Sequence, residues 1–148
     1  MRKIIYTRPD GGVNVVSPVI NTIGEAEGFT EADAEQRAWA TLPKDAINPV
    51  FVDESAIPAD RTFRNAWAAD GEAVVHNIDK CKALAHERRR AAREAEFAPH
   101  DAVIAKRIPG VDLDAAESER AKIRTKYDAV QSAIDAASSV VEIKAALV

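Results

Sequence analysis

The chain has 148 residues, of which 47% are hydrophobic and 30% charged, and its formal net charge is −4. This composition excludes a disordered tail, a collagen-like chain and a disulfide-stapled miniprotein, and it suits one globular domain or a small domain with an extension. No apolar run approaches the roughly 20 residues that a membrane-spanning helix needs. The first residues contain no apolar run of signal-peptide length. We therefore expect neither membrane insertion nor export.

Alanine dominates the apolar residues. The chain contains 29 alanines and only four leucines, against 26 valines and isoleucines together. Alanine favours helices but buries little apolar area, so helices built from it gain little stability from packing. An alanine-rich helical part is therefore expected to gain much of its order from a neighbour, which favours assembly.

The two halves of the sequence differ in charge and in turn-forming residues. Residues 1–77 carry seven Lys/Arg and twelve Asp/Glu, whereas residues 78–148 carry thirteen and twelve. Five of the seven prolines lie in the first half, and Gly110 is the only glycine in the second. We therefore predict an α+β protein. Its expected parts are a small head at 1–77, with an antiparallel β-sheet and one helix, and an α-helical extension at 78–148, with a hairpin and a short last helix.

A β-hairpin and a capped helix are predicted early in the head. Residues 4–7 and 13–16 are rich in β-branched side chains and flank an Asp-Gly turn, a pattern typical of an antiparallel hairpin. Thr30, with Asp33 three residues later, predicts the start of a helix that ends before the next proline. The buried face of this helix is expected to include Ala38 and Trp39. Further strands are expected at residues 49–52 and 73–75.

Helical periodicity opens the second half. From Ile78 to about Phe97, small and apolar residues recur every three or four positions. The segment up to Ile108 is expected to stay helical, with Pro99 either opening a new helix or kinking the old one. The proline-glycine pair at 109–110 then predicts a turn.

A second helix with a regular stripe is expected after that turn. Asp112 or Asp114 can cap its start. Stripe residues alternate steps of four and three, as in a helical hairpin or coiled coil. The stripe consists of Ala116, Arg120, Ile123, Tyr127, Val130, Ile134, Ala137 and Val141, in which Arg120 and the small residues are interruptions. Ser139 with Glu142 forms a capping box for a short last helix over residues 140–147.

Residues that could carry catalysis or hold a metal show no specific arrangement. Cys81 and His86 would point apart, because five residues on a helix turn about 140° beyond one full turn. The three histidines match no zinc spacing. The acidic cluster Asp112, Asp114 and Glu117 fits helix capping and first-turn carboxylates. No glycine-rich phosphate loop is present. We therefore expect no enzyme, no metal and no cofactor.

Two arginine-containing segments are candidate interfaces. Residues 61–67 hold two arginines and two aromatic rings, which either form a local clasp that holds the strand part to the first long helix or make an intermolecular contact. Residues 87–93 form the densest positive patch, but its charge wraps around the helix, and the net charge of −4 does not favour nucleic-acid binding. The predicted interface residues are Arg61, Phe63, Arg64, Trp67, Arg89 and Arg93.

Several segments resemble small proteins encoded in the tail modules of tailed bacteriophages and prophages. The central one is Ile57–Trp67, followed by a short strand and by Asp79-Lys80-Cys81-Lys82-Ala83 leading into the Arg-rich helix. Similar opening and closing segments lie at 4–7, 10–13, 133–137 and 142–147. The resemblance covers most of the chain in patches, and residues 96–113 depart from it. The resemblance implies a phage origin and a virion context more than it implies a mechanism.

These observations lead to one main hypothesis and two alternatives. The main hypothesis is a non-enzymatic structural part of a phage tail, at the tail tip, baseplate or fibre attachment, in contact with copies of itself or other tail proteins. One alternative is a phage-encoded binding protein in the host cytoplasm, such as a defence inhibitor, because acidic proteins can occupy binding surfaces electrostatically. Its acidic residues are Glu25, Glu27, Glu31, Asp33 and Glu35. The other alternative is a fibre-assembly chaperone.

Overall fold

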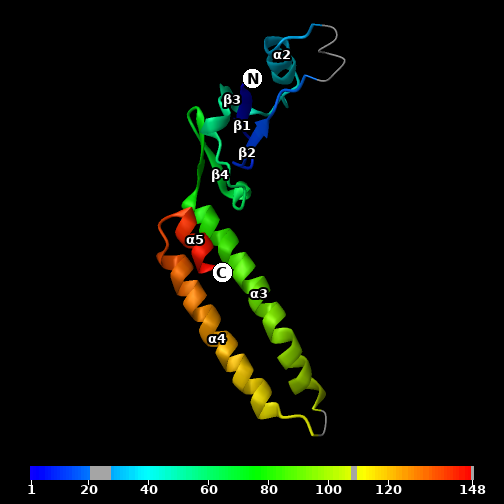
Figure 1. The fold of residues 1–148 in the computed structure, drawn as a ribbon, viewed down its shortest axis with the longest axis vertical. Helices are drawn as coiled ribbons and strands as arrows, with labels where there is room; N and C mark the ends of the chain where they lie inside the picture. Colours follow the sequence, from blue (N-terminus) through cyan, green and yellow to red (C-terminus); the bar gives the residue numbers. More distant parts are fainter. Residues whose placement is uncertain (21–27, 108–109, 148) are drawn as a thin grey trace. The chain divides into compact units, whose positions relative to one another are not determined.

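A computed structural model describes residues 1–20, 28–107 and 110–147. The fold is α+β, as predicted, with a small antiparallel sheet followed by long helices and a short last helix (Figure 1). The chain divides into two compact units, Met1–Asn77 and Ile78–Val148. The first unit carries an excess of Asp/Glu over Lys/Arg, whereas the second carries nearly equal numbers of both.

A three-stranded antiparallel sheet forms the centre of the N-terminal unit. Its strands are β1 (Lys3–Thr7), β2 (Val13–Val16) and β3 (Ile47–Val52), in the order β2-β1-β3. The predicted hairpin between β1 and β2 is confirmed, and its register pairs Ile5 with Val15. Gly11 adopts a φ of 78°, a left-handed conformation that glycine tolerates better than other residues. The backbone N–H of Arg8 donates to the carbonyl of Gly12 at 2.7 Å and closes the turn.

Strand β3 begins two residues earlier than predicted and contains an irregularity. Its register against β1 shifts between the pairs Ile5–Val50 and Thr7–Ile47. Asn48 lies inside this shift with a φ of 48°, a left-handed conformation in which asparagine is enriched. A β-bulge of this kind lets an extra residue fit into one strand, so the strand propensity of residues 49–52 alone could not locate its start.

Helix α2 (Glu31–Ala40) starts with the predicted capping box. The Thr30 side chain accepts from the Asp33 N–H, and the Asp33 carboxylate accepts from the Thr30 N–H at 2.8 Å. The predicted buried face is only partly right, because Ala34 and Glu35 are the buried residues of this helix, Ala38 is half-buried and Trp39 remains 39% exposed. The Trp39 ring stacks on Phe51 of β3 at a centroid distance of 4.8 Å, so only one of its faces is covered.

A second, two-stranded sheet completes the N-terminal unit. Two 3₁₀ turns, Glu54–Ala56 and Arg64–Ala66, precede β4 (Trp67–Asp70), which pairs antiparallel with β5 (Ala73–His76). Strand β4 was not predicted, because its Trp-Ala-Ala-Asp sequence has little strand propensity beyond the tryptophan. One cluster of the core of this unit consists of Ile5, Val13, Val52, Trp67 and Val74.

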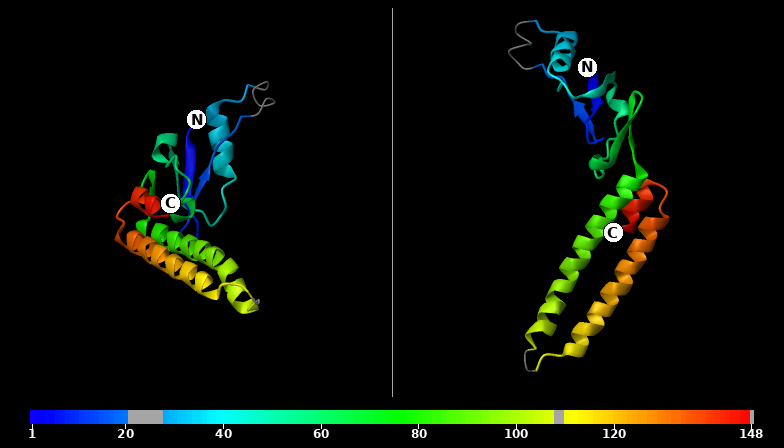
Figure 2. Two further views of the ribbon diagram at one scale, coloured as in Figure 1. Left: turned by 60° about the horizontal axis from the view of Figure 1, so that its bottom comes forward. Right: turned by 180° about the vertical axis from the view of Figure 1, so that it is seen from behind.

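The C-terminal unit is a helical hairpin with a short third helix. Its elements are α3 (Ile78–Lys106), α4 (Leu113–Ala136) and α5 (Val140–Ala146). Helices α3 and α4 lie side by side, and α5 contacts both (Figure 2). Pro99 lies inside α3, so it does not open a new helix. The expected helical end at Ile108 and the expected turn residue Pro109 lie outside the described residues. No helix in the described ranges has the length and apolar content needed to cross a membrane.

The predicted stripe on α4 is confirmed over most of its length. Its residues Ala116, Ile123, Tyr127, Ile134 and Ala137 are buried. Val141, the last predicted member, is instead 76% exposed. Helix α4 ends at Ala136 and α5 starts at Val140. Because the helix is interrupted between them, the spacing of the stripe no longer places Val141 on the buried face.

Side-chain caps start both later helices. The Asp112 carboxylate accepts from the Ala115 N–H at 3.0 Å, so Asp112 rather than Asp114 is the cap of α4. The Ser139 hydroxyl accepts from the Glu142 N–H, as the predicted capping box requires. The reciprocal bond differs from the prediction, because Glu142 accepts from the Ser138 N–H at 2.6 Å. These bonds satisfy backbone donors that a helix start otherwise leaves unpaired.

Candidate interaction site on the helical hairpin

The predicted interface residues of the N-terminal unit divide into buried rings and exposed arginines. Phe63 is 0% and Trp67 1% exposed, whereas Arg61 and Arg64 are exposed. The Trp67 indole N–H donates to His76 Nε2 at 3.2 Å, which fixes the ring inside the unit. Phe63 and Trp67 therefore have almost no exposed surface with which to contact a partner. Their prediction as interface residues was wrong. A contact role for the two arginines stays a prediction.

Arginine and tryptophan do approach one another in this unit. The Arg64 guanidinium lies 5.9 Å from the centroid of the Trp67 ring, close enough for a weak cation–π interaction. This contact is local in the sequence, because Arg64 lies in the 3₁₀ turn that directly precedes Trp67, the first residue of β4. It agrees with the local part of the predicted clasp, and it uses one face of a ring whose remaining surface is buried.

The other two predicted interface residues lie on the side of α3 that meets α4. Arg89 and Arg93 are both half-buried. An Nη atom of Arg89 lies 3.4 Å from the carbonyl of Tyr127, a long contact to which it can donate. The Arg93 guanidinium lies 4.9 Å from the centroid of the Phe97 ring. The Nε atoms of both arginines are buried and have no hydrogen-bond acceptor among the described residues.

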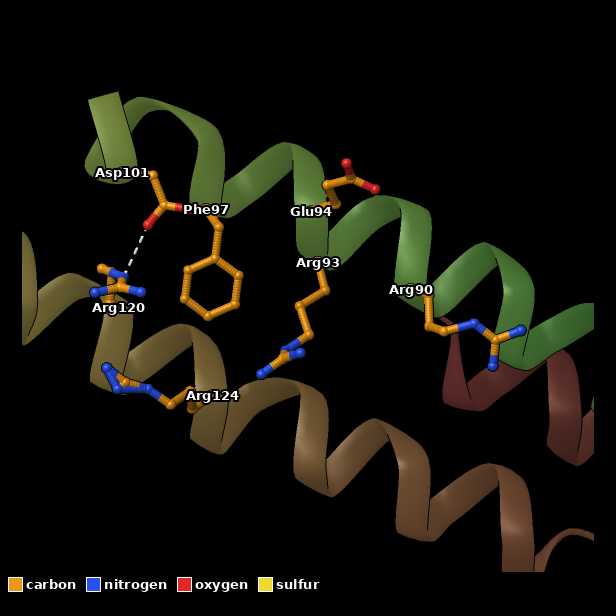
Figure 3. A pocket seen from close by; sticks show the side chains of 7 residues that line it. All are labelled: Arg90, Arg93, Glu94, Phe97, Asp101, Arg120 and Arg124. Atoms are coloured by element: carbon orange, nitrogen blue, oxygen red, sulfur yellow. Dashed lines mark ion pairs between the residues drawn. The ribbon is translucent and has the colours of Figure 1, made fainter. Parts of the chain in front are cut away.

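A groove of about 580 Å³ surrounds Phe97 between α3 and α4 (Figure 3). We call it the Phe97 groove, and its lining residues are Arg90, Arg93, Glu94, Phe97, Asp101, Arg120 and Arg124. Phe97 and Arg93 point from α3 toward α4 in Figure 3. The Arg120 guanidinium lies 5.6 Å from the centroid of the same ring. One aromatic ring therefore contacts a guanidinium from each helix.

Carboxylates compensate the arginines that α4 contributes to this groove. Arg120 pairs with Asp101 at 2.9 Å and also with Glu117, and Arg124 pairs with Glu117 at 3.2 Å. Hydrogen bonds from Arg120 and Arg124 hold the pKa of Glu117 below its ordinary value. Glu117 was expected to belong to a first-turn acidic cluster. It instead serves as the partner of two arginines.

A second polar network links α3 and α4 at Glu96, the residue before Phe97 in the sequence. The Lys126 ammonium donates to Glu96 at 2.6 Å, and the Tyr127 hydroxyl donates to the same carboxylate oxygen at 2.7 Å. The two donors lower the pKa of Glu96, whereas burial raises the pKa of Tyr127. Such charge-assisted bonds fix the register of the hairpin beside the buried Tyr127 ring.

Cys81 and His86 do not form a nucleophile and base. The Cys81 thiol is buried, and this burial raises its pKa, which makes it less reactive. His86 instead contacts Asp135 of α4, with its Nε2 atom 2.9 Å from the carboxylate. Within residues 1–20, 28–107 and 110–147, no group of three or more His, Cys, Asp or Glu side chains could hold a metal ion.

The acidic residues that motivated a host-binding role are partly engaged inside the N-terminal unit. Glu25 and Glu27 lie outside the described residues. The Asp33 carboxylate caps α2, and Glu35 accepts from the Arg2 backbone and guanidinium at 2.6 Å each. These hydrogen bonds lower the pKa of both carboxylates. Glu31 lies 2.8 Å from the Met1 amino group.

Most of the Phe97 groove was not predicted as a site. Arg93 was predicted as an interface residue, but Phe97, Asp101, Arg120 and Arg124 were not. One signal was present in the sequence, since Arg120 occupies a stripe position where an apolar residue was expected. A charged residue in a buried stripe needs partners, and here Asp101 and the Phe97 ring provide them.

Comparisons with known proteins identify no relative of this chain. No protein-family model matches it, no curated protein matches it, and no solved structure matches it. The likeness to phage tail-module proteins therefore stays a prediction, and a function is proposed from the residues and their geometry.

Proposed function

We propose that the chain is a non-enzymatic structural component of a tailed-phage virion, placed at the tail tip, baseplate or fibre attachment. One observation carries the assembly role. Helix α3 runs from Ile78 to Lys106, yet none of its residues from 86 to 106 has a buried side chain. The only buried residues of this helix are Cys81 and Ala85, near its start. A helix with so little burial gains little from its own fold and presents a long surface to a neighbour.

The interactions that hold the far part of the hairpin support this proposal. On the α3 side they are polar and only partly buried, and they include the ion pairs of Lys126 with Glu96 and of Arg120 with Asp101. Exposed pairs contribute about 0–1 kcal/mol each. Most helical stability in proteins comes from packing of an apolar face. A second copy or another tail protein that covers this part of α3 would supply the missing packing.

The phage context rests on the resemblance of the segments 57–67 and 79–83, with the shorter opening and closing segments, to tail-module proteins. The proposed partners are accordingly other tail proteins or further copies of the chain. A host-defence inhibitor is less favoured, because the acidic residues that motivated it bond within their own unit where they are described. A fibre-assembly chaperone differs from a structural part only in being absent from the finished particle.

The test is the protein content of purified particles from the phage or prophage that encodes the chain. We expect quantitative mass spectrometry to find the chain at a fixed ratio to the other tail proteins, and immunogold labelling to place it on the tail. Its presence in assembly intermediates but not in finished particles would indicate a chaperone. Its absence from both, with recovery of a host protein in an affinity pulldown, would indicate the inhibitor instead.

A further inference from the structure

We propose that the Phe97 groove binds the carboxylate side chains of an acidic segment on a neighbouring tail protein. This inference deepens the proposed function and rests on it, because it supplies the chemistry of one assembly contact. Three observations support it. Carboxylates pair with two of the four arginines of the groove but not with the other two, ring contacts orient the guanidinium groups, and acidic residues lie nearby.

The uncompensated charge of the groove lies on α3. Arg120 and Arg124 of α4 each pair with at least one carboxylate. Arg90 and Arg93 of α3 make no ion pair with any described carboxylate. Glu94 lies between these two in sequence, but Figure 3 shows its side chain pointing away from α4. The groove therefore carries two guanidinium groups whose charge the described residues do not neutralise.

Arg93 is held in place for a ligand. Its guanidinium lies against the Phe97 ring at 4.9 Å, and its buried Nε has no acceptor among the described residues. The opposite side of the groove is fixed too, because Arg120 contacts the same ring and Asp101. A guanidinium presents N–H donors in a planar fork that matches the two oxygens of a carboxylate. Since the fork is already oriented, binding costs little side-chain entropy.

The acidic residues around the groove favour separate carboxylates over a nucleic-acid strand. Asp101 lines the groove, and Glu117 bonds to two of its arginines. A phosphodiester strand carries a charge at every nucleotide and would meet these carboxylates along its path. An acidic peptide segment can place one or two carboxylates at Arg93 and Arg90 and neutral residues elsewhere. The groove also offers one ring rather than the series of rings on which bases stack.

Fluorescence anisotropy with a short labelled peptide of alternating Glu and Ser tests this inference on the full chain. We expect this peptide to bind more weakly as salt is added, and its Gln/Ser counterpart not to bind. Arg93→Gln should weaken binding at least about tenfold, because a hydrogen bond to a charged group is lost. Arg93→Lys keeps the charge but not the fork and should give an intermediate loss.

Lys122→Gln is the matched control, because it removes the same charge from α4 at a side chain that is 70% exposed and outside the groove. It should change the affinity less than about twofold, since exposed pairs contribute little. Circular dichroism of each variant checks that the helices persist, and if Arg93→Gln unfolds the hairpin, Arg90→Gln replaces it.

Three results would overturn the inference: no binding of the Glu peptide, binding that the arginine substitutions leave unchanged, or tighter binding of single-stranded DNA than of the peptide. Failure here is separable from failure of the proposed function. A chain that occurs in finished particles but does not bind the peptide is a structural component without this contact.

Discussion

The N-terminal unit and the helical hairpin are similar in length, but they bury different side chains. In the N-terminal unit the largest fully buried residues are Trp67, Phe63, Ile4 and Ile5. In the C-terminal unit they are Ile134, Ile143 and Cys81, and the other buried residues there are Ile123, Tyr127 and three alanines. Because apolar burial contributes roughly in proportion to area, the first unit has the larger packing energy of its own.

This difference locates the part of the chain that depends on a neighbour. The hairpin compensates for its small core with ion pairs and hydrogen bonds between α3 and α4, such as those of Glu96 with Lys126 and Tyr127. These bonds specify which residues meet, but they add little net stability at an exposed surface. Both tryptophans lie in the N-terminal unit, and most helical residues lie in the hairpin. Tryptophan fluorescence and ellipticity at 222 nm therefore report the two regions separately.

The largest effect is expected from Trp67→Ala. Removing this fully buried ring leaves a cavity and should lower the free energy of unfolding by about 3–5 kcal/mol. Urea denaturation followed by the fluorescence of the tryptophan that each variant retains measures it. The matched control is Trp39→Ala, which removes a ring that is 39% exposed and stacked on Phe51 and should cost about 1 kcal/mol. Equal losses in the two variants would contradict the core position of Trp67.

Ile134→Ala tests whether the hairpin has a core at all. Ile134 is fully buried on α4, and its truncation should cost about 2–5 kcal/mol. The loss should appear in denaturation followed at 222 nm. Val141→Ala is the control, since this side chain is 76% exposed and its loss should stay within about 0.5 kcal/mol. A negligible effect of Ile134→Ala would mean that α3 and α4 do not pack in solution as described.

Asp112→Ala should destabilise the start of α4 by about 1 kcal/mol, because the side chain no longer accepts from the Ala115 N–H. The midpoint of the transition at 222 nm measures this loss. Asp128→Ala removes the same charge from an exposed position inside the helix and serves as control. If both variants lose equal stability, the effect is one of charge and not of capping.

The smallest effect is expected from acidification, and its sign follows from the carboxylate pKa values. Hydrogen bonds from Lys126 and Tyr127 hold the pKa of Glu96 below its ordinary value of about 4.5. The stabilisation is therefore complete above that pH and is lost as the pH falls through the folded pKa. Glu117, Glu119 and Glu142 behave alike. The urea midpoint followed by ellipticity at 222 nm should therefore decrease as the pH is lowered. In the Glu96→Gln variant this decrease should be smaller. A steeper fall in the variant would contradict the network.

Local patterns predicted much of this fold. The Asp-Gly turn between β1 and β2 and the box of Thr30 with Asp33 depend on neighbouring residues, and both form as expected. The stripe on α4 also depends on one helix, and its residues from Ala116 to Ile134 are buried or half-buried, as a face against α3 requires. Each of these features has its physical cause within a few residues of itself.

The features that sequence reasoning missed depend on distant partners. Strand β4 exists because it pairs with β5, and Trp39 is half-exposed because α2 packs through Glu35 and Arg2. The capping box at Ser139 predicted the helix break before Val141, but the stripe was wrongly extended across that break. The Phe97 groove brings together residues of two helices, so its arginines could be predicted singly but not as a set.

Hydrogen exchange of the isolated chain tests the central claim most directly, namely that the far part of α3 lacks packing of its own. Amide protection grows with the free energy of local opening. We predict that amides of residues 86–106 exchange much faster than those of Lys3–Thr7 in dilute protein, and that they slow once the chain is built into particles. Equal protection of the two segments in a dilute monomer would contradict the account.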